Sequence, residues 1–163
     1  MKIGFIGLGN VGAKLADSLL RTVSELTVRD LNDALVQSFV DRGATRAASP
    51  KEMTERVDLI ITCLPSPTVC SAVMESKEGI IGGLSAGKIW LEMSTTDESE
   101  VIRLAKLVAA KGAMAMDCPV SGGCHRAATG NISIFAGGER ETFERVLPIL
   151  TSMGRRILHT GPI

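Results

Sequence analysis

The 163-residue chain contains no tyrosine, one tryptophan and four phenylalanines, so aromatic side chains make up only 3% of it. Proteins that bind single-stranded nucleic acid stack bases on such side chains, and a chain with so few is poorly suited to that function. Lysine plus arginine and aspartate plus glutamate number 18 each, so the formal net charge is zero. We therefore expect neither nucleic acid nor an anionic membrane as a partner.

Long apolar runs and leader-like segments are also lacking. No apolar run approaches the roughly 20 residues that a membrane span requires, and the N-terminus leads directly into a short apolar segment without a signal-peptide pattern. These features predict a cytoplasmic protein. The length suits one domain, and a domain of this size buries about 70% of the surface that its unfolded chain exposes.

Cysteine and histidine are too few and too scattered for a structural metal site. The chain has two histidines, and its four cysteines form no C-x-x-C pair: Cys63, Cys70, Cys118 and Cys124. No zinc set can be assembled from them at standard spacing, so we expect no metal. The cysteines are predicted to be small buried or half-buried thiols in a reducing compartment.

Residues 1–30 carry the strongest pattern of the chain. The apolar run 3–6 predicts a buried strand. A G-x-G-x-x-G motif follows it, Gly7-Leu8-Gly9-Asn10-Val11-Gly12, and apolar residues then recur at helical spacing. A second apolar run, 26–28, ends in Arg29 and Asp30. The order of strand, glycine turn, helix, strand and acid is that of a dinucleotide-binding site.

Each position of this pattern has a physical role. Gly7 allows the tight turn, Gly9 lets a pyrophosphate approach the backbone, and Gly12 lets the helix pack closely on the strand. The helix N-terminus offers free N–H groups and positive potential to the phosphates. Asp30 can accept hydrogen bonds from the ribose and would repel a 2′-phosphate, which favours NAD over NADP. Arg29 leaves this preference open, although it should point to the other side of the strand.

The main alternative within this architecture is a methyltransferase that binds S-adenosylmethionine, which also uses a glycine turn and an acid. The third glycine and the spacing of the segments favour the dinucleotide.

The remaining chain alternates predicted strands and helices. Apolar strands are expected at 57–64, 88–93, 113–117, 132–136 and 155–159. Helices are expected at 34–40, 67–74, 97–109 and 139–153, and a further helix is expected to start at 49–52. Loops are expected at 79–87 and 119–126. This alternation predicts an α/β fold, a doubly wound, mostly parallel, three-layer sheet of the Rossmann type. Residues 1–163 then form one dinucleotide-binding domain.

Ligands of such sheets lie at the carboxyl ends of the strands. Leu64-Pro65 and Thr95 follow two strands and could border a cofactor, but Pro65 could simply end its strand and Thr95 could belong to a helix cap. Ser121-Gly122-Gly123 combines a hydroxyl with unhindered N–H groups, which suits a carboxylate. The alternative is an ordinary glycine loop.

Several segments together resemble the β-hydroxyacid dehydrogenase family, which includes 3-hydroxyisobutyrate dehydrogenase and, more distantly, 6-phosphogluconate dehydrogenase. The matching segments are 4–12, 63–65, 92–95, 117–123, 136–138 and 159–163. The resemblance implies hydride transfer between a nicotinamide cofactor and a small β-hydroxy acid. It also implies that Leu64, Pro65 and Thr95 contact the cofactor, and that Ser121, Gly122 and Gly123 hold the substrate carboxylate.

Two of the departures from the family pattern bear on function. Cys124-His125-Arg126 stands where the family has small or acidic residues; it could add positive charge toward a dianionic substrate or be an exposed loop. The family's catalytic lysine follows a glycine-rich turn, and no lysine of this chain follows such a motif. We therefore expect no catalytic residue within 1–163, and a helical C-terminal catalytic domain outside them.

Two alternatives to a β-hydroxyacid dehydrogenase domain are open at this point. One is a non-catalytic nucleotide-sensing module, and the other is an NADP-dependent semialdehyde or imine reductase of the same architecture. Without a helical partner domain, apolar surface near residue 163 would be exposed, so a homo-oligomer is also open.

Overall fold

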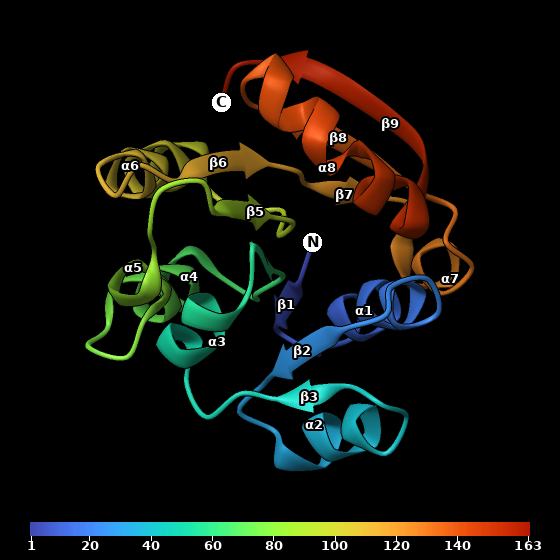
Figure 1. The fold of residues 1–163 in the computed structure, drawn as a ribbon. Helices are drawn as coiled ribbons and strands as arrows, with labels where there is room; N and C mark the ends of the chain where they lie inside the picture. Colours follow the sequence, from blue (N-terminus) through green and yellow to red (C-terminus); the bar gives the residue numbers. More distant parts are fainter.

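Nine strands form one sheet in the computed structural model, which describes residues 1–163, and helices cover both faces of this sheet (Figure 1). The strands are β1 (Ile3–Ile6), β2 (Leu26–Arg29), β3 (Thr45–Arg46), β4 (Leu59–Thr62), β5 (Ile89–Glu92), β6 (Met114–Asp117), β7 (Val120–Ser121), β8 (Ile132–Gly137) and β9 (Gly154–Gly161). The helices are α1 (Gly12–Leu20), α2 (Asp33–Val40), α3 (Pro50–Arg56), α4 (Pro67–Glu75), α5 (Ile80–Gly83), α6 (Glu98–Ala109), α7 (Gly123–Ala128) and α8 (Arg140–Met153). The predicted three-layer α/β fold is confirmed.

The strand order places the functional edge of the sheet. The order is β3-β2-β1-β4-β5-β6-β8-β7, and β9 pairs with β8. The first six of these strands run parallel, whereas β8 is antiparallel to β6 and β7. The chain changes direction across the sheet between β1 and β4, where Ile6 lies opposite both Arg29 and Thr62. The carboxyl ends of the strands therefore meet along one edge at this switch point.

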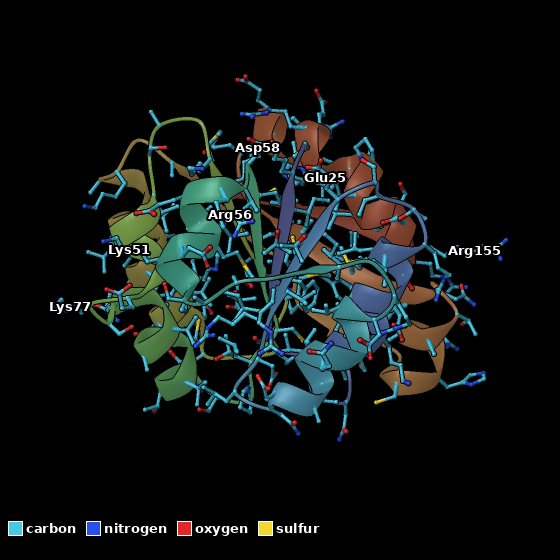
Figure 2. All side chains as sticks on the ribbon, turned by 60° about the horizontal axis from the view of Figure 1, so that its bottom comes forward. Glu25, Lys51, Arg56, Asp58, Lys77 and Arg155 are labelled. Carbon is cyan, nitrogen blue, oxygen red and sulfur yellow. The ribbon has the colours of Figure 1, made fainter.

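Both faces of the central strands are apolar, because each face is covered by helices. In β5, Ile89 and Leu91 belong to the core beneath α1 and α8, whereas Trp90 belongs to the core beneath α3, α4 and α6. Because successive side chains of a strand enter two different apolar cores, the sequence of each central strand is a continuous apolar run. Apart from Glu92, which is buried, the charged side chains are at least partly exposed, and Figure 2 shows Lys77 and Arg155 projecting from the periphery. No helix combines the length and the apolar character that crossing a membrane requires.

Helix caps fix the start of two helices beside the functional edge. The Ser49 hydroxyl accepts a hydrogen bond from the Glu52 N–H at 3.1 Å, and the Glu52 carboxylate accepts one from the Ala48 N–H at 2.6 Å. Ser66 caps α4 by accepting from the Val69 N–H at 3.2 Å. Each such cap contributes about 1 kcal/mol to stability.

The structure corrects two of the expected loops. Residues 79–87 contain the short helix α5, and residues 119–126 contain β7 and the start of α7. Elements this short show too little periodicity to be recognised in sequence. Strand β7 also depends on a long-range partner, because Ser121 pairs with Ser133 of β8. A glycine such as Gly122 is typical of a turn in sequence. In the structure Gly122 has φ +130° and joins β7 to α7.

Candidate functional site

A cleft of about 1270 Å³ opens at the carboxyl ends of β1, β2, β4 and β5. Its size exceeds the roughly 300–1,000 Å³ of common small-molecule sites, which suits an extended ligand such as a dinucleotide. All the predicted cofactor-binding residues except Leu8 line it: Gly7, Gly9, Asn10, Val11, Gly12, Asp30, Leu64, Pro65 and Thr95. Leu8 is buried, and its contribution to the site is a backbone N–H.

The three glycines of the turn differ in what surrounds them. Gly7 has φ +100°, and a Cβ there would collide with the carbonyl oxygen of Cys63. A Cβ on Gly12 would collide with the carbonyl oxygen of Gly7. Gly9 has nothing within 4 Å of its Cβ position. Gly7 and Gly12 are therefore required by the fold, whereas Gly9 leaves open space for a ligand beside the backbone.

Asp30 follows β2 and holds the glycine turn in place. One carboxylate oxygen accepts a hydrogen bond from the Leu8 N–H at 2.6 Å, and the other accepts one from the Asn32 N–H at 2.8 Å. A carboxylate has about four acceptor positions, so acceptor capacity remains for ribose hydroxyls. The structural tie to Leu8 is a second role for Asp30 that sequence reasoning missed.

Arg29 is the last residue of β2 and directly precedes Asp30. Both residues line the cleft, and Arg29 is anchored there because its Nη1 donates to the Ala47 carbonyl oxygen at 3.3 Å. The alternation of side chains holds only within a strand, and β2 ends at Arg29. A cationic and an acidic residue therefore both line this end of the cleft.

At the other end of the cleft, the segments after β4 and β5 are tied together. The Leu64 N–H donates to the Ser94 hydroxyl at 2.7 Å. The Ser94 N–H donates to a carboxylate oxygen of Glu92 at 2.6 Å. Thr95, the next residue, is exposed on the cleft, and its hydroxyl lies 3.5 Å from the carbonyl oxygen of Val120.

Glu92 is fully buried beneath these segments. Its second carboxylate oxygen accepts hydrogen bonds from the Thr62 hydroxyl at 2.7 Å and the Cys70 thiol at 3.1 Å. The Trp90 indole N–H donates to the same Thr62 hydroxyl at 2.8 Å. Sequence reasoning missed this network; the available signal was an acid at the end of an otherwise apolar strand.

Burial and nearby carboxylates shift the pKa of several groups around Glu92. Burial and Glu92 raise the pKa of the Cys63 thiol to about 12 and also raise the pKa of Cys70, and burial, Asp117 and Glu92 raise the pKa of Cys118. These thiols stay protonated and cannot act as thiolate nucleophiles. Burial, Glu92 and Glu98 raise the pKa of Asp117 to about 6. Cys124 is exposed, contrary to the expectation that the cysteines are buried or half-buried.

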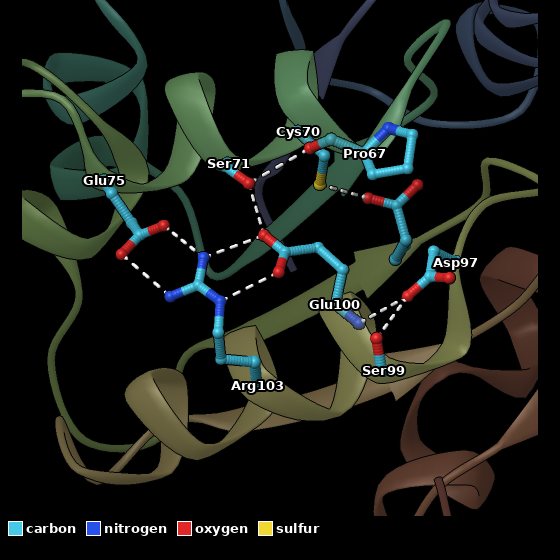
Figure 3. Close-up of polar contacts among 9 residues, drawn as sticks. Pro67, Cys70, Ser71, Glu75, Asp97, Ser99, Glu100 and Arg103 are labelled. Carbon is cyan, nitrogen blue, oxygen red and sulfur yellow. Dashed lines mark hydrogen bonds and ion pairs between the residues drawn. The ribbon is translucent and has the colours of Figure 1, made fainter.

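Helix α4 forms one wall of the cleft, which sequence reasoning also missed. Its lining residues are Thr68, Val69, Ala72 and Val73. Figure 3 shows how α4 is held against α6: Arg103 bridges Glu75 of α4 and Glu100 of α6, and the Ser71 hydroxyl donates to Glu100. Arg103 and Ser71 lower the pKa of Glu100 to about 2, so this clamp stays charged at ordinary pH.

The predicted carboxylate loop reaches the cleft only in part. Gly123 lines the cleft together with Val120, whereas Ser121 and Gly122 are exposed and outside its lining. Residues 124–126 are exposed on α7 and do not line the cleft either. No group of three or more histidine, cysteine or acidic side chains is arranged to hold a metal ion.

Known proteins are similar to this chain in sequence and in fold. The chain is 34% identical to 2-(hydroxymethyl)glutarate dehydrogenase of Eubacterium barkeri over 161 residues, which is 99% of this chain and 54% of that protein. It is 37% identical to 3-sulfolactaldehyde reductase of Escherichia coli (strain K12) over 159 residues, covering 98% of this chain and 53% of that protein.

Solved structures agree. The solved structure of Mycobacterium tuberculosis 3-hydroxyisobutyrate dehydrogenase with L-serine superposes with a TM-score of 0.89 at 26% identity, covering 99% of this chain and 54% of that one. The chain thus spans about half the length of the curated relatives it matches. The family model for the NAD-binding domain of 6-phosphogluconate dehydrogenase matches residues 2–161, and the chain belongs to this family of NAD-binding domains.

Proposed function

We propose that the cleft binds NAD in an extended conformation across the switch point between β1 and β4. The observation that carries this proposal is the open Cβ position of Gly9, between the start of α1 and the carboxylate of Asp30. The pyrophosphate lies against Gly9 and the N-terminal end of α1, where free N–H groups favour anions. The adenosine ribose donates its hydroxyl hydrogens to Asp30.

The same residues favour NAD over NADP. The Asp30 carboxylate would repel a 2′-phosphate, and both of its oxygens are already oriented by backbone N–H groups. Arg29 opposes this preference because its guanidinium lines the same end of the cleft. One of its N–H groups is engaged with Ala47, which leaves the preference for NAD moderate rather than absolute.

The whole protein is proposed to be a dehydrogenase or reductase that acts on a small β-hydroxy acid resembling 3-hydroxyisobutyrate. The cofactor, when bound, accepts or supplies the hydride. Ser121 and the N–H groups of Gly122 and Gly123 orient the substrate carboxylate, which is a positioning contribution. A helical domain outside residues 1–163 supplies the group that moves the hydroxyl proton. The names of the relatives and their roughly doubled length support this division.

A paired titration with NADH and NADPH, read out by melting temperature, tests the cofactor assignment. A ligand at about 100 times its Kd stabilises the folded state by roughly 2.7 kcal/mol, which is readily measured. We expect stabilisation by NADH and a smaller effect of NADPH. Equal stabilisation would contradict the role of Asp30, and no stabilisation by either would contradict the binding site.

The reaction is tested on the longest reading frame that contains residues 1–163. We expect NAD-dependent oxidation of 3-hydroxyisobutyrate or a similar acid. Tight cofactor binding without turnover of any acid, semialdehyde or imine would instead support a nucleotide-sensing module.

A further inference from the structure

Glu92 is a buried acid without a cationic partner. It is 0% exposed, and the six ion pairs of the chain, all between partly exposed side chains, do not include it. An acid buried without a counter-charge is costly unless hydrogen bonds compensate it. The question is therefore which groups compensate Glu92 and what its charge faces.

Every hydrogen-bond partner of this carboxylate donates to it. The Ser94 N–H can only donate. The Thr62 hydroxyl accepts from the Trp90 indole N–H and donates to Glu92. The Cys70 thiol supplies the third donor from α4, and Figure 3 shows this side chain pointing inward from the helix. Three donors and no acceptor are the environment of an ionised carboxylate.

The network reaches the cleft through two adjacent segments. Ser94 is bound to Glu92 through its N–H and to Leu64 through its hydroxyl. Leu64 and Ser94 both line the cleft, as does Thr95. The charge of Glu92 therefore lies directly behind the wall made by the ends of β4 and β5.

Strand order decides which half of a dinucleotide would face this wall. Along the sheet, β2 with Asp30 lies on one side of the glycine turn, and β4 and β5 lie on the other side. With the adenosine ribose at Asp30, the nicotinamide half extends toward Leu64 and Ser94. The nicotinamide ring carries a positive charge when it is oxidised and is neutral when it is reduced.

We propose that the buried charge of Glu92 makes the cleft favour the oxidised, cationic form of the cofactor over the reduced, neutral form. This inference rests on the proposed NAD site. Glu92 acts without touching the ligand: its charge acts across the strand ends, and its hydrogen bonds position Ser94. Asp117, its neighbour in the paired strand β6, adds negative charge on the same face of the sheet. A medium less polar than water strengthens the effect of both charges.

The test compares Kd for NAD+ and for NADH by calorimetry at pH 8 in the wild type, Glu92→Gln and Thr62→Val. Glu92→Gln removes the charge and nearly preserves the side-chain volume. Thr62→Val disturbs the same network without changing charge, so it is the matched control. We expect Glu92→Gln to raise the NAD+ to NADH ratio of Kd values by about fivefold. Thr62→Val should change both Kd values together and leave the ratio unchanged.

Equal ratios in the wild type and Glu92→Gln, or the same shift in Thr62→Val, would overturn the inference while leaving the NAD site intact. No binding of either form to the wild type would overturn the proposed site and this inference together. Circular dichroism verifies the fold of each variant. If Glu92→Gln does not fold, Asp117→Asn decides, because removing the neighbouring charge should shift the ratio in the same direction by a smaller factor.

Discussion

The two ends of the cleft are built by different means. At the β1–β2 end, the backbone itself makes the site: Gly7 and Gly12 permit a close turn, and Gly9 leaves room beside it. At the β4–β5 end, side chains make the site, because Glu92 and Ser94 hold two strand ends together through hydrogen bonds. The first kind of construction depends on steric exclusion and the second on a buried polar network.

This difference predicts how substitutions affect the two ends of the cleft. Steric exclusion is local, so a single methyl group in the wrong place is enough to destroy the geometry. A hydrogen-bonded network fails more gradually, because each bond contributes modestly while an unsatisfied buried group costs more. Substitutions at the two ends of the cleft therefore separate these behaviours.

The largest expected effect comes from Gly9→Val. The new side chain would project into open space in the cleft, where the proposed pyrophosphate lies. We expect NADH affinity to fall by at least about 100-fold, with unfolding free energy within about 0.5 kcal/mol of the wild type. Calorimetry and urea unfolding measure the two quantities. Retained affinity would show that the phosphates bind elsewhere.

Gly12→Ala changes the same turn as Gly9→Val, but we expect it to affect the stability of the fold more directly than ligand binding. Its methyl group would collide with the carbonyl oxygen of Gly7, so the damage falls on the fold before it falls on the ligand. We expect a loss of about 3 kcal/mol in unfolding free energy, measured by urea unfolding without any cofactor. A variant as stable as the wild type would contradict the close packing of α1 on β1.

Asp30→Ala tests both roles of this carboxylate. The Leu8 and Asn32 N–H groups lose their acceptor, and the cofactor loses its ribose partner. We expect NADH affinity to fall about tenfold, or about 1.4 kcal/mol. The preference for NADH over NADPH should become smaller. Asp30→Asn, which keeps one acceptor oxygen, should narrow the preference with a smaller loss of stability. An unchanged preference in both variants would remove Asp30 from the ribose site.

Ser94→Ala probes the other end of the cleft. The Leu64 N–H would lose its acceptor, which costs about 1–3 kcal/mol of stability for a buried group and loosens the contact between β4 and β5. We expect both NAD+ and NADH to bind about threefold more weakly, because the wall of the cleft moves while its charge stays. Thermal melts and calorimetry record these effects. A change in one Kd alone would point to a direct contact between Ser94 and the nicotinamide.

The smallest effect is expected for Asp117→Asn and depends on pH. Burial, Glu92 and Glu98 raise the pKa of Asp117 from 3.8 to about 6 in the folded state. Between these values the folded chain binds more protons than the unfolded chain, so the stability contributed by this group falls as pH rises. The asparagine variant should therefore melt about 2–4 °C higher than the wild type at pH 8. This gain should disappear near pH 4, and a gain independent of pH would contradict the assignment.

The sequence predicts one end of the cleft far better than the other. Gly7, Gly9, Gly12 and Asp30 lie within one short segment, so their spacing alone indicates the turn and its acid. The long apolar strands and amphipathic helices likewise predict the order of elements and the parallel sheet. Where the backbone leaves no room for a side chain, the sequence has glycine at that position, so this requirement can be recognised from the sequence.

The β4–β5 end of the cleft cannot be predicted in this way, because the residues that interact there are distant in sequence. Thr62 and Glu92 are separated by 30 residues, and Cys70 and Glu92 by 22. Which donors surround a buried acid is decided by strand register and helix packing, and neither is visible in residue spacing. The same reason hides β7, whose pairing with β8 exists only after the chain has folded.

Trp90 gives this hidden end of the cleft an optical reporter. The chain has one tryptophan and no tyrosine, so its near-ultraviolet fluorescence comes almost entirely from one indole. That indole is fully buried and donates its N–H to Thr62, whose hydroxyl donates in turn to Glu92. Emission from the unlabelled protein therefore registers the polarity around the buried Thr62–Glu92 network, free of background from the rest of the molecule.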